Sequence, residues 1–189
     1  MTKLFTVIIL LLSNIALAQF EYDASEAHPF GLPNPKAPKQ IKDYEKLIGL
    51  CDCTSQSLNK DQTWADPVSM TWRFEYILNG MAIQDKTLKE DGRHSGSIRQ
   101  YNVDSARWYV HYFTAPVPSA KLSTWEGNTQ ENGNIVLYKP STAPNGTEGF
   151  FRLTFSEISS DGFNWIGEWV DQSETVVFPT WKIKCKKRE

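Results

Sequence analysis

The chain lacks any apolar run long enough to cross a bilayer. A transmembrane helix needs about 20 predominantly apolar residues, and the longest such stretch spans only residues 4–12. Ala16-Leu17-Ala18 follow it, in the small-x-small pattern that precedes signal-peptidase cleavage. We therefore predict a cleaved signal peptide at residues 1–18, a secreted or periplasmic protein, and no membrane insertion. Gln19, not a cysteine, stands directly after the cleavage point, so we expect no lipoprotein anchor.

The sequence also lacks an excess of positive charge. Its 20 Lys and Arg residues stand against 22 Asp and Glu, a net charge of −2. Nucleic-acid-binding proteins usually carry a positively charged surface. Because this chain has no excess of positive charge, we expect no nucleic-acid partner. Aromatic residues, in contrast, make up 13% of the chain. Because Trp, Tyr and Phe favour pleated, half-buried surfaces, this content indicates strands.

Turn signals divide most of the chain into short segments. Residues 19–39 are rich in proline and polar residues and predict an extended amino-terminal arm. A short helix is expected in "KQIKDYEKLIG", where Ile41, Tyr44, Leu47 and Ile48 recur at helical spacing. After it, turns at near-regular intervals predict an antiparallel meander. Closure removes exposed edges, so we predict an all-β, up-and-down barrel of about 8–10 strands at residues 40–189, with its first and last strands paired.

The three cysteines lie at the two ends of this predicted barrel. Cys51 and Cys53 share one face of the first strand, and Cys185 lies on the last strand. If these strands are neighbours, Cys185 can form a disulfide with one of the pair; the alternative is that all three are small buried hydrophobic residues. No histidine or fourth cysteine has the spacing of a tetrahedral metal site, so we expect no metal.

The Asn79-Gly80 pair sets the register of one hairpin. It lies between two runs of alternating polarity, which is typical of a two-residue turn. Counting outward from this turn places Phe74 opposite Asp85. We predict an inner face, with Asp85 as its one charged member, made of Trp72, Phe74, Tyr76, Leu78, Met81 and Ile83. The other face, predicted to be exposed to solvent, carries Arg73, Glu75, Gln84 and Lys86.

The next hairpin places a second charge inside the barrel. A register with Tyr101 opposite Trp108 also sets Arg99 opposite Val110 and Ser97 opposite Tyr112. An isolated buried charge is very costly. Arg99 is therefore expected to pair with Asp85, to pack on a tryptophan, or to meet a charged ligand.

These motifs together resemble a known group of proteins. The pattern "LIGLCDC … TWRFEYILNGMAIQD … SGSIRQYNVDSARWYVHYF … TWEG … RLTFSEISSDGFNW … TWKIKCKKR" is similar to uncharacterised bacterial secreted proteins of the lipocalin-like, calycin type, over Leu47 to Arg188. The resemblance implies an antiparallel barrel opened by a short helix, and no agreed activity. Lipocalins proper begin their first strand with Gly-x-Trp, whereas this chain has Gly49-Leu50-Cys51.

A haem cofactor is not expected. Nitrobindin-like barrels hold haem through one histidine, and the histidines of this chain fall in the arm, in a loop and on a predicted outer face: His28, His94 and His111. We therefore expect no cofactor.

The best-supported function is the binding of a small, mainly apolar ligand with one polar anchor. The candidate ligand-binding residues are Trp72, Phe74, Tyr76, Asp85, Arg99, Tyr101, Trp108 and Tyr112. One alternative is a lyase- or isomerase-type enzyme that uses Asp85, Arg99 and Tyr101 in the cavity. Glycosidic chemistry would need a second inward acid beside Asp85, and the candidate, Glu168, has an ambiguous orientation. Another is a structural or interaction module with a solidly filled barrel. The volume of the interior separates this module from the other two, and nothing in the sequence sets the oligomeric state.

Overall fold

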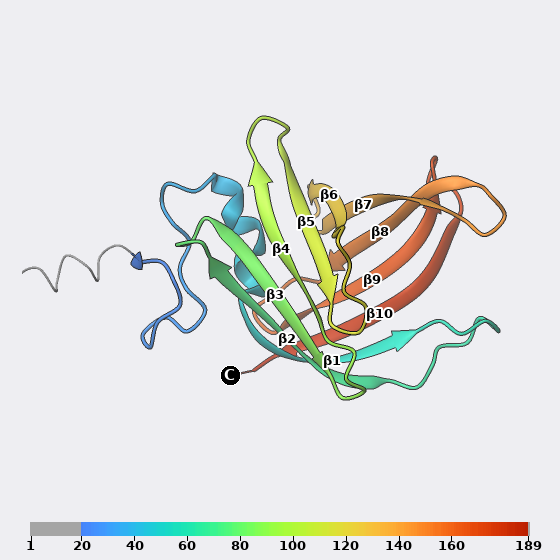
Figure 1. Cartoon of the computed structure of the whole chain (residues 1–189), viewed down its shortest axis with the longest axis horizontal. Coiled ribbons are helices and arrows are strands. Elements are labelled where there is room, and N and C mark those ends of the chain that lie inside the picture. Colours follow the sequence, from blue (N-terminus) through green and yellow to red (C-terminus); the bar gives the residue numbers. More distant parts are fainter. Residues whose placement is uncertain (1–19, 189) are drawn as a thin grey trace, which may run out of the picture.

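The computed structural model describes residues 20–188 and forms a closed barrel of ten antiparallel strands (Figure 1). Strands that follow one another in the chain are neighbours in the barrel, and the first strand also pairs with the last. The strands are β1 (Gly49–Ser57), β2 (Val68–Ile77), β3 (Ala82–Lys89), β4 (Ser95–Asn102), β5 (Arg107–Thr114), β6 (Ser123–Thr129), β7 (Ile135–Thr142), β8 (Glu148–Ser156), β9 (Gly162–Asp171) and β10 (Val177–Lys187). The predicted up-and-down barrel is confirmed.

The predicted signal peptide at residues 1–18 lies outside the described residues. Among residues 20–188, no helix combines the length and the apolar composition that a membrane span requires. Secretion therefore stays a prediction.

The predicted helix is a 3₁₀ helix, η2 (Lys39–Leu47), at one end of the barrel (Figure 1). Ile41, Tyr44 and Leu47 recur every third residue and are all buried. This spacing matches the three residues per turn of a 3₁₀ helix and places the three side chains on one face. That face packs into the barrel core, so this end of the interior is filled.

Both predicted hairpin registers are confirmed. In β2–β3, Tyr76 pairs with Ile83 and Phe74 with Asp85. In β4–β5, Arg99 pairs with Val110, as predicted. Successive side chains of a strand point to opposite faces, so these registers place Asp85 and Arg99 inside the barrel on the adjacent strands β3 and β4.

The predicted inner positions of Leu78 and Met81 are wrong. Their side chains are 60% and 41% exposed, and the last pair of the hairpin is Ile77 with Ala82. Leu78, Asn79 and Gly80 all have positive φ, at 55°, 53° and 76°. The turn therefore takes four residues instead of two.

Contacts with the arm explain this longer turn. The amide of Tyr22 donates to Asn79 Oδ1 at 3.0 Å, and the amide of Asn79 donates to Asp23 Oδ1 at 2.7 Å. Asn34 Nδ2 donates to the Asn79 carbonyl at 2.9 Å. A Cβ on Gly80 would lie 2.3 Å from the carbonyl oxygen of Leu32. The arm is thus docked on the turn, and glycine is needed where the two backbones meet.

The outer face of β2–β3 is also covered in part, which corrects its predicted exposure to solvent. Arg73 donates to the Pro29 carbonyl at 2.6 Å and lies 4.5 Å from the centre of the Phe30 ring. Glu75 is only 9% exposed and forms ion pairs with Arg73 at 2.7 Å and Lys86 at 2.9 Å. Burial would raise the pKa of Glu75, but the hydrogen bonds and charges of its two partners outweigh burial and hold the pKa below its usual value.

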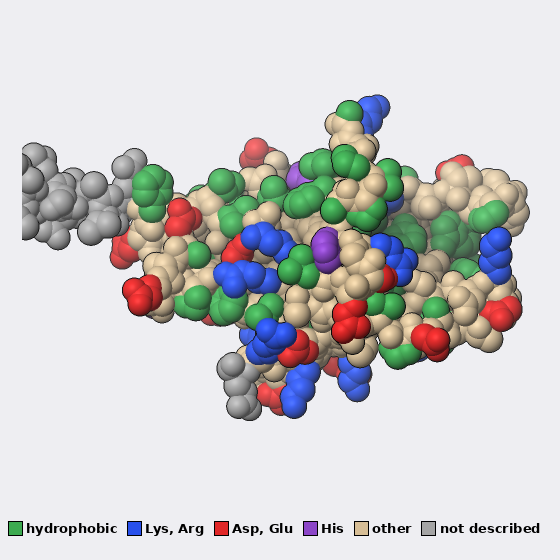
Figure 2. Space-filling view, turned by 60° about the horizontal axis from the view of Figure 1, so that its bottom comes forward, with side chains coloured by type: hydrophobic (Ala, Val, Ile, Leu, Met, Phe, Trp, Pro, Cys, Tyr) green, Lys and Arg blue, Asp and Glu red, His purple; other side chains and the backbone are tan. Residues whose placement is uncertain are grey.

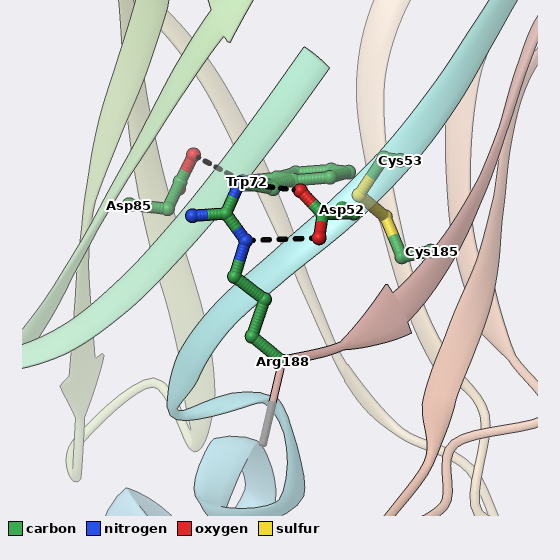
Figure 3. The surroundings of a disulfide bond; sticks show 6 residues. All are labelled: Asp52, Cys53, Trp72, Asp85, Cys185 and Arg188. Carbon is green, nitrogen blue, oxygen red and sulfur yellow. Dashed lines mark hydrogen bonds and ion pairs between the residues drawn. A yellow bond between two sulfur atoms is a disulfide. The ribbon is translucent and has the colours of Figure 1, made fainter. Parts of the chain in front are cut away.

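A disulfide joins the two strands at the seam of the barrel. Cys53 on β1 and Cys185 on β10 are directly opposite and bonded, 132 residues apart in the chain (Figure 3). Close to them, Arg188 forms an exposed ion pair with Asp52 at 2.6 Å (Figure 3). The predicted bridge to Cys185 is confirmed, and its partner is Cys53.

The remaining cysteine, Cys51, is buried and free. Burial raises the pKa of its thiol, against a smaller opposing effect of Lys187. Because the thiolate is the reactive form, we expect an aromatic disulfide reagent at pH 8 to leave the native protein unlabelled and to label one thiol after unfolding. The Cys51→Ala variant should release no signal in either state. Labelling of the native protein at the rate of a free thiol would contradict this expectation.

Candidate functional site

A cavity of about 340 Å³ lies inside the barrel. Its walls are mainly aromatic and aliphatic side chains from the inner faces of the strands, including Trp72, Val110, Trp125, Phe151, Leu153 and Trp165. Side chains alternate between the inside and the outside of a barrel, which brings these residues together from five strands. The hypothesis of a solidly filled barrel is therefore wrong.

The cavity lies toward the end of the barrel opposite η2. Its lining includes Thr87 and Ser95, which flank the β3–β4 turn, and Ser123, the first residue of β6. Figure 2 shows a hollow with hydrophobic side chains on the side of the molecule away from the arm. The interior is thus divided into a part packed against η2 and an open part.

Asp85 and Arg99 form a buried ion pair on the wall of this cavity. Both residues are only 3% exposed. Asp85 Oδ2 accepts hydrogen bonds from Arg99 Nη1 and from Ser97 Oγ. Asp85 Oδ1 accepts one from Trp72 Nε1 at 2.9 Å (Figure 3). The predicted pairing of the two inward charges is confirmed, and both carboxylate oxygens are engaged.

Aromatic rings surround the guanidinium of Arg99. Its Cζ lies 5.1 Å from the centre of the Phe74 ring and 5.2 Å from that of Tyr44. Burial opposes the charge, but the effects of Asp85 and Tyr44 together outweigh it, so the pKa of Arg99 is raised. Burial also raises the pKa of Tyr44 to about 12, despite the opposing charge of Arg99. The guanidinium therefore stays charged, and its contact with the Tyr44 ring connects the cavity wall to η2.

The predicted ligand-binding residues fall into two groups. Four line the cavity: Trp72, Asp85, Arg99 and Tyr112. Four do not belong to its lining and lie with Tyr44 and Leu47 in the hydrophobic core or against it: Phe74, Tyr76, Tyr101 and Trp108. Trp108 illustrates the second group, because its ring meets Tyr44 edge-on at 4.9 Å and its Nε1 donates to Asp43 at 3.0 Å. The side chains of this second group are therefore packed in the core and do not face the cavity.

The enzyme hypothesis required Asp85, Arg99 and Tyr101 in one cavity. Tyr101 is not part of the lining, and the carboxylate of Asp85 is saturated by three donors. Glu168 points outward, because side chains alternate along β9 and Trp165, three residues earlier, lines the cavity. On the outer face Glu168 forms an ion pair with Arg152 at 2.8 Å. Of the described residues that line the cavity, Asp85 is the only acid. This arrangement offers no pair of carboxylates for acid–base chemistry.

None of the three histidines lines the cavity. His94 Nδ1 accepts a hydrogen bond from the backbone amide of Lys89 at 3.1 Å, and His111 Nδ1 lies 3.0 Å from Thr124 Oγ1. His28 is in the arm. Within residues 20–188, no three His, Cys, Asp or Glu side chains gather as a metal site requires.

Two inward-facing lysines were not among the predicted site residues. Lys139 on β7 lines the cavity, and its Nζ lies 4.3 Å from the centre of the Trp125 ring. Lys89 at the end of β3 lies with its Nζ 4.3 Å from the centre of the Trp181 ring. Burial lowers the pKa of both amines; at Lys89, the charge of Arg93 adds to this effect. Strand alternation was the available signal, because Lys139 shares a face with Ile135 and Leu137.

Sequence comparisons do not assign the chain to a family. No protein-family model matches it, and no curated protein matches it. Among solved structures, an S-type phycobiliprotein lyase from Guillardia theta is 12% identical, with a TM-score of 0.47, over 77% of this chain and 90% of that one. A protein of unknown function from the DUF3598 family of Nostoc punctiforme is 6% identical, with a TM-score of 0.26, over 80% of this chain and 100% of that one. Similarities this low carry no argument about activity.

Proposed function

We propose that this barrel binds a small, mainly apolar molecule in its cavity. The observation that carries the proposal is the cavity itself, about 340 Å³ in volume and lined mainly by aromatic and aliphatic side chains. Ligand sites are typically concave, about 300–1,000 Å³ in volume, and largely apolar with a few convergent polar groups. The volume lies at the small end of this range and favours a compact ligand.

The polar part of the lining supports a specific ligand over an empty void. Cavities that stay empty are lined by apolar groups alone. Here the hydroxyls of Tyr112 and Ser123 and the ammonium of Lys139 share the wall with the aromatic rings. Such groups fix the orientation of a ligand whose affinity comes from the buried apolar surface.

The proposal includes an oxidising compartment, secreted or periplasmic. The signal-like pattern of residues 1–18 supports it. The Cys53–Cys185 disulfide supports it independently, because such bonds persist outside the reducing cytosol.

A blocked cavity tests the proposal. Ser123→Phe adds a ring inside the cavity, whereas Ser69→Phe adds the same ring on the exposed outer face of β2. We expect the wild type and Ser69→Phe to bind the neutral fluorophore N-phenyl-naphthylamine saturably, with quenching of tryptophan fluorescence. Ser123→Phe should bind it roughly tenfold or more weakly, because apolar contact area is lost. Equal binding by all three proteins, or no binding by any, would contradict the proposal.

A further inference from the structure

The cavity wall between β6 and β7 holds a lysine that is stacked on a tryptophan. The Nζ of Lys139 lies 4.3 Å from the centre of the Trp125 ring. The ion pairs found among residues 20–188 do not include it. Its pKa is lowered by burial alone, with no contribution from a nearby charge. Lys139 therefore presents an uncompensated positive charge to the cavity.

The same tryptophan carries a second unused donor. Trp125 Nε1 is buried and has no hydrogen-bond partner among the described residues. Buried N–H groups are nearly always paired, and an unpaired one calls for an explanation such as an absent ligand. Both side chains line the cavity and the ammonium lies over the indole ring, so Lys139 and Trp125 share one patch of the wall. An acceptor bound at this patch would satisfy both.

The cavity's own acid cannot serve as this acceptor. Asp85 is already held by Arg99, Ser97 and Trp72. The other acidic side chains of the described chain are not part of the lining. The formal charges of Asp85 and Arg99 cancel. Because Lys139 is the remaining charged residue of the lining, the lining carries one net positive charge.

From this arrangement we infer that the ligand is an organic acid with a compact apolar body. Its carboxylate accepts hydrogen bonds from Lys139 Nζ and Trp125 Nε1, while its body lies against the aromatic walls. The inference rests on the proposed function and adds the chemical class of the ligand. It also moves the polar anchor from the Asp85–Arg99 pair to β6 and β7.

Lys89 is a weaker candidate for this role. Its ammonium lies over Trp181, but the Nε1 of that tryptophan already donates to Ser55 Oγ at 2.7 Å. Lys89 is also absent from the cavity lining. Lys89→Gln is therefore a discriminating variant.

The experiment compares two probes that share one ring system, naphthaleneacetic acid and its neutral amide, naphthaleneacetamide. Binding to the full mature protein is measured at pH 7 by tryptophan quenching and titration calorimetry. We expect the wild type to bind the acid roughly ten- to hundredfold more tightly than the amide, the range of one charge-assisted hydrogen bond. Lys139→Gln should lose this preference while keeping its affinity for the amide, and Lys139→Arg should retain it.

A matched control lies on the outer face. Lys182 Nζ lies 4.1 Å from the centre of the Trp64 ring, so Lys182→Gln removes the same kind of stacked amine outside the cavity and should change nothing. Equal binding of acid and amide by the wild type would overturn the inference and leave the proposed function standing. So would loss of the preference in Lys89→Gln but not in Lys139→Gln. Failure of the wild type to bind either probe or the neutral fluorophore would overturn both.

Discussion

Replacing Arg99 with methionine should lower the free energy of unfolding by about 3–5 kcal/mol, the cost of leaving one member of a buried ion pair alone. The variant keeps the length and most of the volume of the side chain. It leaves the buried Asp85 carboxylate with only two neutral donors, Ser97 and Trp72. Asp85→Asn should cost a similar amount, because it leaves a guanidinium that is 3% exposed without a counter-charge. Urea unfolding followed by tryptophan fluorescence measures both changes.

The double variant Asp85→Asn/Arg99→Met tests whether the two effects share one cause. It leaves this site without a charge, and the amide oxygen introduced at position 85 can still accept from Trp72 Nε1. We expect it to be more stable than the sum of the single effects by about 1–3 kcal/mol, the coupling typical of residues in one network. Arg107→Met, which breaks an exposed ion pair with Glu126, is the control and should leave the unfolding midpoint nearly unchanged. Strictly additive single effects would show that the pair does not act as a unit.

The same variants separate a structural role from a binding role. If the pair supports the wall and Lys139 anchors the ligand, the double variant keeps its preference for naphthaleneacetic acid over the amide. If Arg99 itself meets the ligand's acid group, that preference disappears with Arg99→Met at temperatures where the variant is folded. Circular dichroism at the temperature of the titration establishes that condition.

Local sequence signals were sufficient for the paired strands but not for the turn between them. The alternation of polarity around Asn79-Gly80 fixed which residues of β2 and β3 face inward, because a one-residue slip would reverse every side chain. It failed at Leu78 and Met81, where the arm bonds to the turn from residues 22, 23 and 34. Contacts between residues so far apart in the chain leave no trace in the local pattern.

The cysteines show the same limit. Cys51 and Cys53 lie on one face of β1, so alternation alone could not choose between them. The register of β1 against β10 makes the choice, because it sets Cys53 opposite Cys185 and Cys51 opposite Lys187. That register depends on closure of the whole barrel.

In the site, the sequence predicted the pair but not the cavity. Two hairpin registers were enough to bring Asp85 and Arg99 to neighbouring inner positions. Which part of the interior stays open depends on η2, whose buried Tyr44 packs against Trp108 and Phe155. Docking of a helix is a tertiary event, so Phe74 and Trp108 could not be told apart from Trp72 by alternation. The inward orientation of Lys139 could have been predicted from the alternation of β7, but its contact with the Trp125 ring could not have been.

Removing the Cys53–Cys185 disulfide should destabilise the barrel by about 2–5 kcal/mol, the usual range for native disulfides in small domains. The two residues are 132 positions apart. In the chain-entropy account, a loop of this length places the effect near the upper end of the range, because the open unfolded chain gains the most freedom. The comparison is best made between Cys51→Ala and the triple variant Cys51→Ala/Cys53→Ala/Cys185→Ala, so that no free thiol can form another bridge.

The barrel should nevertheless remain closed without the bond. Seven residue pairs connect β1 to β10, from Cys51–Lys187 to Ser57–Trp181, and their backbone hydrogen bonds do not depend on the sulfurs. We therefore expect native-like circular dichroism in the triple variant, with faster amide hydrogen exchange concentrated in β1 and β10, since the seam would then open more often than other strand pairs. Naphthaleneacetic acid should still bind, because the cavity wall that carries Lys139 and Trp125 lies on β6 and β7. Exchange that accelerates equally in all ten strands would instead show that the disulfide acts on global unfolding alone and that the seam is not a local weak point.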